Sequence, residues 1–321
     1  MSDPLYAAAE TAIHQCMALE AGESCAVVTD DDRLPIGETL YDVASDVTDD
    51  TVLLRYPPGE QHGTEPPAPV AAAMADADVV LAPTTKSLSH TRARQGATDA
   101  GARAATLPGI TEDVMIAGLD ADYAVIERHC LSVLEQVADA DEIRVTTPAG
   151  TDLVVEPGDR EWLSDTGLVH DPGDFSNLPA GETFVSPETA DGTYVVDGTM
   201  MPHGLLDDPI RFEVEDGHVT HISDDAVREQ VDRARADVGR DATNLAELGI
   251  GTNVGVTALM GSVLLDEKAA GTVHVAIGDD AGIGGDVEAP LHLDGILCDP
   301  TVYADGDVID LPEPDPEAEA A

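Results

Sequence analysis

The segment LHLDGIL (residues 291–297) is apolar enough to form a buried β-strand, yet it contains His292 and Asp294. Side chains two residues apart on a strand point to the same face of a sheet. An imidazole and a carboxylate are therefore expected together on one side of a strand that belongs in a protein interior. Ionisable groups in such a place need a partner charge or a metal ion, because burying an unpaired charge is costly.

The half of the chain that contains this segment is rich in further strand patterns. Runs of β-forming residues with Asp-Gly or Ala-Gly turns include EIRVTTPAGTDLVVEP (142–157), IRFEVEDGHVTHI (210–222) and TVHVAIG (272–278). We therefore expect a sheet-rich α+β domain over residues 141–312. The acidic, proline-containing segment 313–321 is expected to be a disordered tail.

The first half has a different pattern, in which strands and helices alternate. The expected strands are CAVVTD (25–30), TVLLRY (51–56), DVVLAP (78–83) and ARAATLP (102–108), with helical segments between them. This alternation predicts a doubly wound, mostly parallel α/β domain over residues 1–140. No G-x-G-x-x-G motif follows the first strand, so a dinucleotide site is not expected there.

The charge balance excludes several classes of partner. The chain has 64 acidic and 15 basic residues, which gives a net charge of −49. Nucleic acid and anionic membranes both require a basic surface, so neither is an expected partner. The sequence has no apolar run long enough for a membrane span and no signal-peptide pattern, so we expect a cytoplasmic protein. The acidic coat suits a cytoplasm of very high salt, where its self-repulsion is screened.

Ionisable residues also lie in other apolar segments of the second half. They are His274 in TVHVAIG, Glu247 in NLAELGIG (244–251) and Glu182 in FSNLPAGETF (175–184). A single residue of this kind is more often structural than a ligand, and a lone Glu is ordinary in so acidic a chain. Taken together, and with few arginines in this half, they favour a divalent metal site, because imidazole and carboxylate ligands suit Zn, Co, Mn or Fe.

Several segments resemble one known family. NLPAGETF (177–184), AELGIGTN (246–253), LLDEKAAGTVHVAIGDD (264–280) and LHLDGIL resemble the thermophilic metallopeptidases of the leucyl aminopeptidase and aminopeptidase T group. The segments AGTDLVVEPG (149–158) and SLSHTRARQGATDAGARAATLPGI (87–110) are similar to matching parts of that family.

The resemblance implies an N-terminal α/β domain, a C-terminal metal-binding domain of the aminopeptidase T type and a homodimer. It implies two divalent ions (Zn, Co or Mg) and hydrolysis of N-terminal residues from a peptide substrate by a metal-activated water. Glu182 would also be catalytic, as a carboxylate that moves a proton. The metal ligands that the resemblance implies are Glu182, Glu247, Glu267, His274, His292 and Asp294.

Two positions depart from the peptidase pattern. Gly181 stands where the peptidases have a second Glu, and GDDAGIGG (278–285) lacks a Tyr that follows the strand histidine in them. These departures suit a branch that resembles 2,5-dihydroxypyridine dioxygenases, in which two His and one Asp hold a single Fe(II). His274, His292 and Asp294 match that ligand type.

In this dioxygenase branch a histidine of the N-terminal domain assists the chemistry, and His90 in SLSHT is the matching position; it also suits a polar residue at a helix start. The peptidase is the first expectation, with the dioxygenase and a non-catalytic metal-binding relic as alternatives. The glycine-rich GIGTNVG (249–255) is interpreted as a turn that passes close to the metal pocket.

Overall fold

The structure is a computed structural model that describes residues 3–315. The chain forms two compact units. The first comprises the chain up to Glu127 together with Thr166–Ala180, and the second comprises Arg128–Asp165 together with the chain from Gly181 onward. The expected domain limits, 1–140 and 141–312, stay a prediction. Most of the expected tail (313–321) lies outside the described residues.

The first unit is built on a five-stranded parallel sheet in the order β2-β1-β3-β4-β8. Its strands are β1 (Cys25–Asp30), β2 (Thr51–Tyr56), β3 (Val79–Thr84), β4 (Arg103–Pro108) and β8 (Phe175–Asn177). Its helices are α1 (Pro4–Glu10), which continues as a π-helical segment (Thr11–Cys16), α2 (Leu34–Val47), α3 (Ala68–Asp76), α4 (Arg92–Asp99) and α5 (Glu112–Leu119). The helix α6 (Tyr123–Val137) crosses from the first unit into the second.

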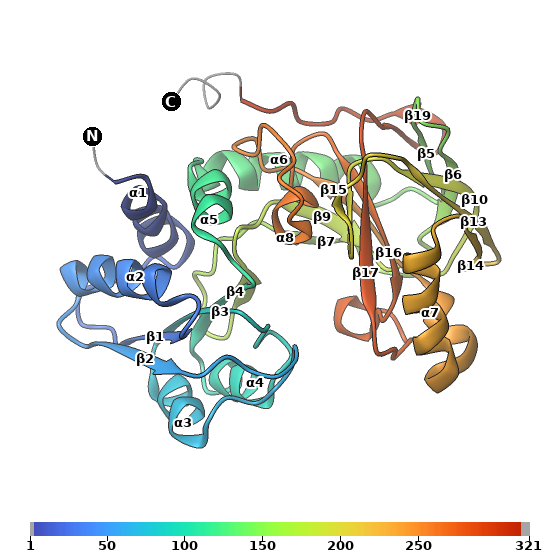
Figure 1. The fold of residues 1–321 in the computed structure, drawn as a ribbon. Helices are drawn as coiled ribbons and strands as arrows, with labels where there is room; N and C mark the ends of the chain where they lie inside the picture. Colours follow the sequence, from blue (N-terminus) through green and yellow to red (C-terminus); the bar gives the residue numbers. More distant parts are fainter. Residues whose placement is uncertain (1–2, 316–321) are drawn as a thin grey trace. The chain divides into compact units, whose positions relative to one another are not determined.

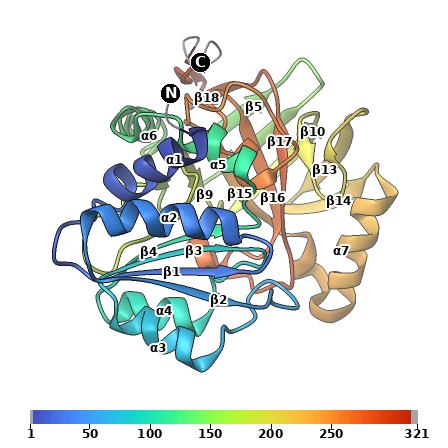
Figure 2. The same ribbon diagram turned by 60° about the vertical axis from the view of Figure 1, so that its left-hand side comes forward.

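The apolar runs of β1 and β3 explain why this sheet is covered on both sides. Every residue of these two strands is buried, as expected for a parallel sheet with helices on both faces. Figure 2 shows α2 on one face of the sheet and α3 and α4 on the other. The expected doubly wound α/β architecture is confirmed. Helix α5 and strand β8 were not expected, and β8 is a three-residue strand far along the chain.

The second unit contains two antiparallel sheets of seven strands each within the described residues. The first has the order β14-β13-β10-β6-β5-β18-β19 and the second β12-β11-β17-β16-β15-β9-β7. The strands of the first are β5 (Ile143–Thr146), β6 (Asp152–Glu156), β10 (Thr189–Val196), β13 (Ile210–Glu215), β14 (His218–Ile222), β18 (Thr301–Ala304) and β19 (Asp307–Val308). Those of the second are β7 (Leu163–Asp165), β9 (Glu182–Val185), β11 (Thr199–Met200), β12 (Gly204–Leu205), β15 (Leu245–Gly251), β16 (Val273–Gly278) and β17 (His292–Leu297).

Buried side chains of both sheets form one apolar core in this unit. Tyr194 and Phe212 of the first sheet stack with ring centroids 4.4 Å apart, and Leu248 and Val275 of the second sheet belong to the same core. Helix α7 (Asp225–Val238) and the short α8 (Val263–Asp266) complete the unit. Among residues 3–315, no helix is long and apolar enough to cross a membrane.

Candidate metal centre

Four neighbouring strands of the second sheet carry most of the ligands expected from the sequence. Strands β17, β16, β15 and β9 lie side by side in this order (Figure 1). Five expected ligands lie on these strands: Glu182, Glu247, His274, His292 and Asp294. The sixth, Glu267, directly follows α8. The fold therefore gathers residues that are more than 100 positions apart in the chain.

The pairing register explains why the strand residues face the same side. Asp294 pairs with Ala276, which pairs with Glu247. Residues directly opposite on paired strands share a face, and so do residues two apart on one strand. A β-bulge between Leu245 and Glu247 shifts the register of β15, and it sets Glu247 on this face. The other face contributes the apolar core, so the sheet has one apolar and one ionisable surface.

Glycine creates the space for the ring of His274. His274 pairs with Gly249 on the adjacent strand, and a Cβ at Gly249 would lie 2.0 Å from the His274 Nε2 atom. The imidazole therefore lies directly over the bare backbone of β15. Gly249 and Gly251 belong to a strand rather than to the expected turn, although the close approach to the site is as expected.

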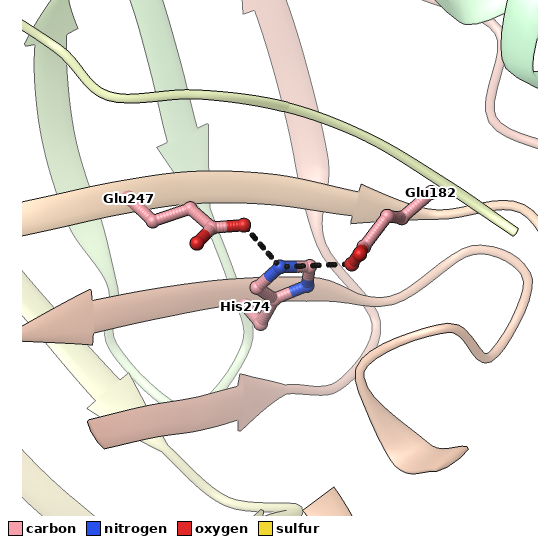
Figure 3. A group of neighbouring side chains, drawn as sticks. All are labelled: Glu182, Glu247 and His274. Atoms are coloured by element: carbon pink, nitrogen blue, oxygen red, sulfur yellow. Dashed lines mark hydrogen bonds and ion pairs between the residues drawn. The ribbon is translucent and has the colours of Figure 1, made fainter. Parts of the chain in front are cut away.

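Glu247 lies between the two imidazoles. The Nε2 atom of His274 is 3.2 Å from Glu247 Oε1 and 3.3 Å from Glu182 Oε2 (Figure 3). The Nε2 atom of His292 is 3.2 Å from Glu247 Oε2 and 3.4 Å from Asp294 Oδ1. Two groups of three possible ligands result, Glu182–Glu247–His274 and Glu247–His292–Asp294. In each group the donor atoms lie within 4.8 Å of one another.

The charged groups perturb one another strongly. Burial alone would lower the pKa of His274, but its hydrogen bond to Glu247 and the nearby carboxylate charges raise that pKa to about 9. Burial also opposes protonation of His292, yet the charge of Asp294 raises its pKa well above the usual range. Burial would raise the pKa of Glu247, but hydrogen bonds to both imidazoles lower it. A divalent cation would replace the protons on these imidazoles, because a metal-bound imidazole is neutral.

A buried carboxylate oxygen without a hydrogen bond supports a metal ion at this site. Glu182 Oε2 is buried and accepts no hydrogen bond among the described residues, and its contact is the ion pair with His274 Nε2 at 3.3 Å. A cation would take over the role of the positive charge on the imidazole, because a metal-bound imidazole is neutral. The ring of His292 is oriented in the way typical of a metal ligand. Its Nδ1 lies 2.7 Å from the backbone oxygen of Asp279, so Nδ1–H donates there and Nε2 is left facing the carboxylates.

Lys268 is a residue of this site that the sequence reasoning did not find. Its side chain is buried, and Nζ donates to Glu182 Oε1 at 2.7 Å and to Glu267. Burial would lower the pKa of Lys268, but the two carboxylates raise it well above its usual value. Burial raises the pKa of Glu182, and it raises that of Glu267 to about 7. Two features of the sequence indicate Lys268 as a residue of the site. It is one of only two lysines in the chain, and it is adjacent to the candidate ligand Glu267.

His90 lies in the first unit, between β3 and α4, and its side chain is exposed. The assigned ligand and catalytic roles of the seven residues, His90 included, stay predictions.

The parallel α/β unit and the face of carboxylates and imidazoles define a metal-dependent enzyme of mixed α/β fold. The chain belongs to the family described as NicX, 2,5-dihydroxypyridine 5,6-dioxygenase, whose sequence model matches residues 7–310. The expected resemblance to the metallopeptidases is confirmed for the fold only. The family to which the chain belongs is that of the dioxygenase.

Two solved structures are similar to this chain. One is 2,5-dihydroxypyridine dioxygenase from Pseudomonas putida KT2440, with a TM-score of 0.76, 20% identity and coverage of 98% of each chain. The other is AmpT from Thermus thermophilus, with a TM-score of 0.68, 19% identity and coverage of 96% of this chain and 99% of AmpT. At these identities the likeness establishes the fold alone. No matching relative was found among curated protein sequences.

Proposed function

We propose that this protein is a dioxygenase with a single Fe(II) that opens the ring of a dihydroxylated pyridine or a closely similar aromatic compound. The observation that carries the proposal is the family match over residues 7–310. It is supported by two imidazoles and a carboxylate on one sheet face, His274, His292 and Asp294. Two histidines and one carboxylate are the ligand set typical of non-haem Fe(II) oxygenases.

The residues of the site have distinct proposed roles. His274, His292 and Asp294 would hold the ion, although they come from both of the groups that share Glu247. Glu247, between the imidazoles, would be a further ligand or a partner that orients them. Bound there, Fe(II) would supply the redox chemistry that joins O₂ to an electron-rich ring. Glu182, which lies 3.3 Å from His274 Nε2 and 2.7 Å from Lys268 Nζ, would be the carboxylate that moves a proton near the reaction. His90 would assist the chemistry, as the family resemblance implies.

A metal-dependent aminopeptidase is the second candidate. It is favoured by the two groups of possible ligands that share Glu247, since a shared carboxylate can bridge two ions. In that case Glu182, Glu247 and His274 would hold one ion, and Glu247, His292 and Asp294 the other. The fold likeness to AmpT is compatible with this candidate. Against it, Lys268 already supplies a positive charge between Glu182 and Glu267.

Metal content and two assays separate the candidates. Protein purified without oxygen in molar KCl would be loaded with Fe(II), Co(II) or Zn(II), and bound metal would be counted per chain. The dioxygenase predicts one ion per chain and O₂ uptake with 2,5-dihydroxypyridine that requires Fe(II). Two ions per chain, together with release of N-terminal residues from short peptides by the Co(II) or Zn(II) form, would favour the peptidase. Bound metal without turnover of either substrate would favour the non-catalytic relic.

We further propose a homodimer in a cytoplasm of high salt. The dimer follows from the family resemblance alone and the salt requirement from the net charge of −49. Sedimentation in molar KCl would test the dimer.

A further inference from the structure

The loop between β16 and β17, residues 279–291, determines how His292 is presented. Its first residue, Asp279, provides the backbone oxygen that accepts the His292 Nδ1–H at 2.7 Å. This hydrogen bond fixes the plane of the ring, and in the neutral ring that binds a metal it leaves the lone pair on Nε2. Whatever holds the Asp279 carbonyl in place therefore also aims Nε2 of His292.

Asp280 is the anchor of this loop. Its side chain is only 3% exposed. One oxygen accepts hydrogen bonds from Ser186 Oγ at 3.0 Å and Asn244 Nδ2 at 2.8 Å, and the other accepts from the backbone N–H of Val287 at 2.7 Å. A Cβ at Gly285 would lie 2.0 Å from the Asp280 carboxyl carbon, so the loop closes tightly around this side chain.

The partners of Asp280 lie in segments that flank the strands with the candidate ligands. Ser186 directly follows β9, which begins at Glu182, and Asn244 directly precedes β15, which contains Glu247. Asp280 itself follows β16, the strand of His274, and Val287 lies in the loop that leads into β17. One buried carboxylate thus joins the segments that connect four adjacent strands at one end of the sheet.

The three bonds are strong and all come from neutral donors. A carboxylate accepts shorter and stronger hydrogen bonds than a neutral oxygen does. Replacement by Asn would put an NH₂ group opposite either a backbone N–H or the two side-chain donors. At least one donor would then be left buried and unpaired, which is unfavourable.

We propose that Asp280 is a positioning residue of the metal centre. By joining the segments that connect the four strands, it fixes the Asp279 carbonyl and hence the direction of His292 Nε2, and it fixes the start of the strand that carries Glu247. This inference rests on the proposed metal centre, but it does not depend on which reaction the centre catalyses.

The test uses Asp280→Asn, with Glu288→Gln as the control, because Glu288 is an exposed carboxylate of the same loop. Ser186→Ala is a milder second variant that removes a single donor. Each full-length protein would be titrated with Co(II) in molar KCl. Affinity would be measured by calorimetry and coordination by the visible d–d absorption of bound Co(II).

We expect Asp280→Asn to weaken Co(II) binding by about 10–100-fold, the usual effect of losing a residue that orients a metal ligand. Its Co(II) spectrum at saturation should also change. Ser186→Ala should weaken binding less, and Glu288→Gln should leave affinity and spectrum unchanged. Wild-type affinity and spectrum in Asp280→Asn would overturn the inference. If that variant does not fold, wild-type binding by Ser186→Ala would overturn it.

The two proposals fail in different ways. Wild-type protein that binds Co(II) but, with Fe(II), consumes no O₂ would refute the proposed function and leave the role of Asp280 intact. Wild-type protein that binds no divalent ion would overturn the role of Asp280.

Discussion

Gly249→Ala provides a direct test of whether His274 is a metal ligand. The new methyl carbon would lie 2.0 Å from His274 Nε2 and 2.1 Å from Cε1, whereas ordinary contacts begin at 3.4 Å. The imidazole would therefore have to retreat by about 1.4 Å. Metal–ligand distances tolerate changes of only about 0.2 Å, so the ring would leave the ion.

The expected effect is a loss of Co(II) affinity of at least about 10–100-fold, the usual effect of losing a residue that only orients a ligand, which corresponds to about 1.4–2.7 kcal/mol of binding free energy. Overpacking should also lower the free energy of unfolding by about 1–3 kcal/mol. Calorimetric titration of the metal-free protein in molar KCl measures the first quantity, and urea unfolding measures the second.

Gly96→Ala is the matched control for Gly249→Ala. Gly96 lies in α4, and nothing lies within 4 Å of the position of an added Cβ. This variant should bind Co(II) as the wild type does. A folded Gly249→Ala protein with wild-type Co(II) affinity and absorption would refute the assignment of His274 as a ligand.

Three further predictions concern pH, charge and salt. The folded state raises the pKa of Glu267 to about 7 and that of His274 to about 9, so it favours the protonated form of each group. The resulting stabilisation of the metal-free protein is present at low pH and should fall as pH rises, through about 7 for Glu267 and about 9 for His274. For His274 the loss between pH 6.5 and 9 is on the order of 3 kcal/mol, and a flat urea-unfolding profile over this range would contradict it. Lys268→Met should destabilise the protein by about 3–5 kcal/mol, because it leaves Glu182 and Glu267 buried without their ammonium partner. Adding Glu182→Gln to Lys268→Met should recover part of this loss in urea unfolding, and no recovery would argue against the pair. Raising KCl from about 0.1 M to about 2 M should raise the melting temperature by screening the net charge of −49; a melting temperature that does not rise with KCl would contradict the halophilic interpretation.

The sequence alone was enough to predict the architecture of the first unit. Mostly apolar runs such as residues 25–30 and 78–83, separated by helical segments, have few alternatives to a parallel sheet with helices on both faces. It did not predict β8 at Phe175–Asn177. A three-residue strand has no periodicity to detect, and its place beside β4 depends on a return of the chain.

The sequence also pointed to Glu182, Glu247, His274, His292 and Asp294, because ionisable groups are conspicuous in apolar segments. Glu267 came only from the family resemblance, and Lys268 was not found. The sequence could not say how the residues are grouped. The two groups that share Glu247 depend on a β-bulge and on the pairing of strands that are distant in sequence. The family resemblance indicated the fold. The family match over residues 7–310, rather than any single residue pattern, favours the dioxygenase over the peptidase.

What the sequence determined by itself was therefore local: alternating elements, an acidic surface and the apolar strand LHLDGIL with His292 and Asp294 on one face. Those properties follow from composition and from periods of two or 3.6 residues. Only the tertiary structure decided that Gly249 makes room for His274, that Lys268 lies between Glu182 and Glu267, and that Asp280 joins the segments that connect four strands. These relations depend on which residues of separate strands lie opposite one another, and no local pattern in the chain encodes that register.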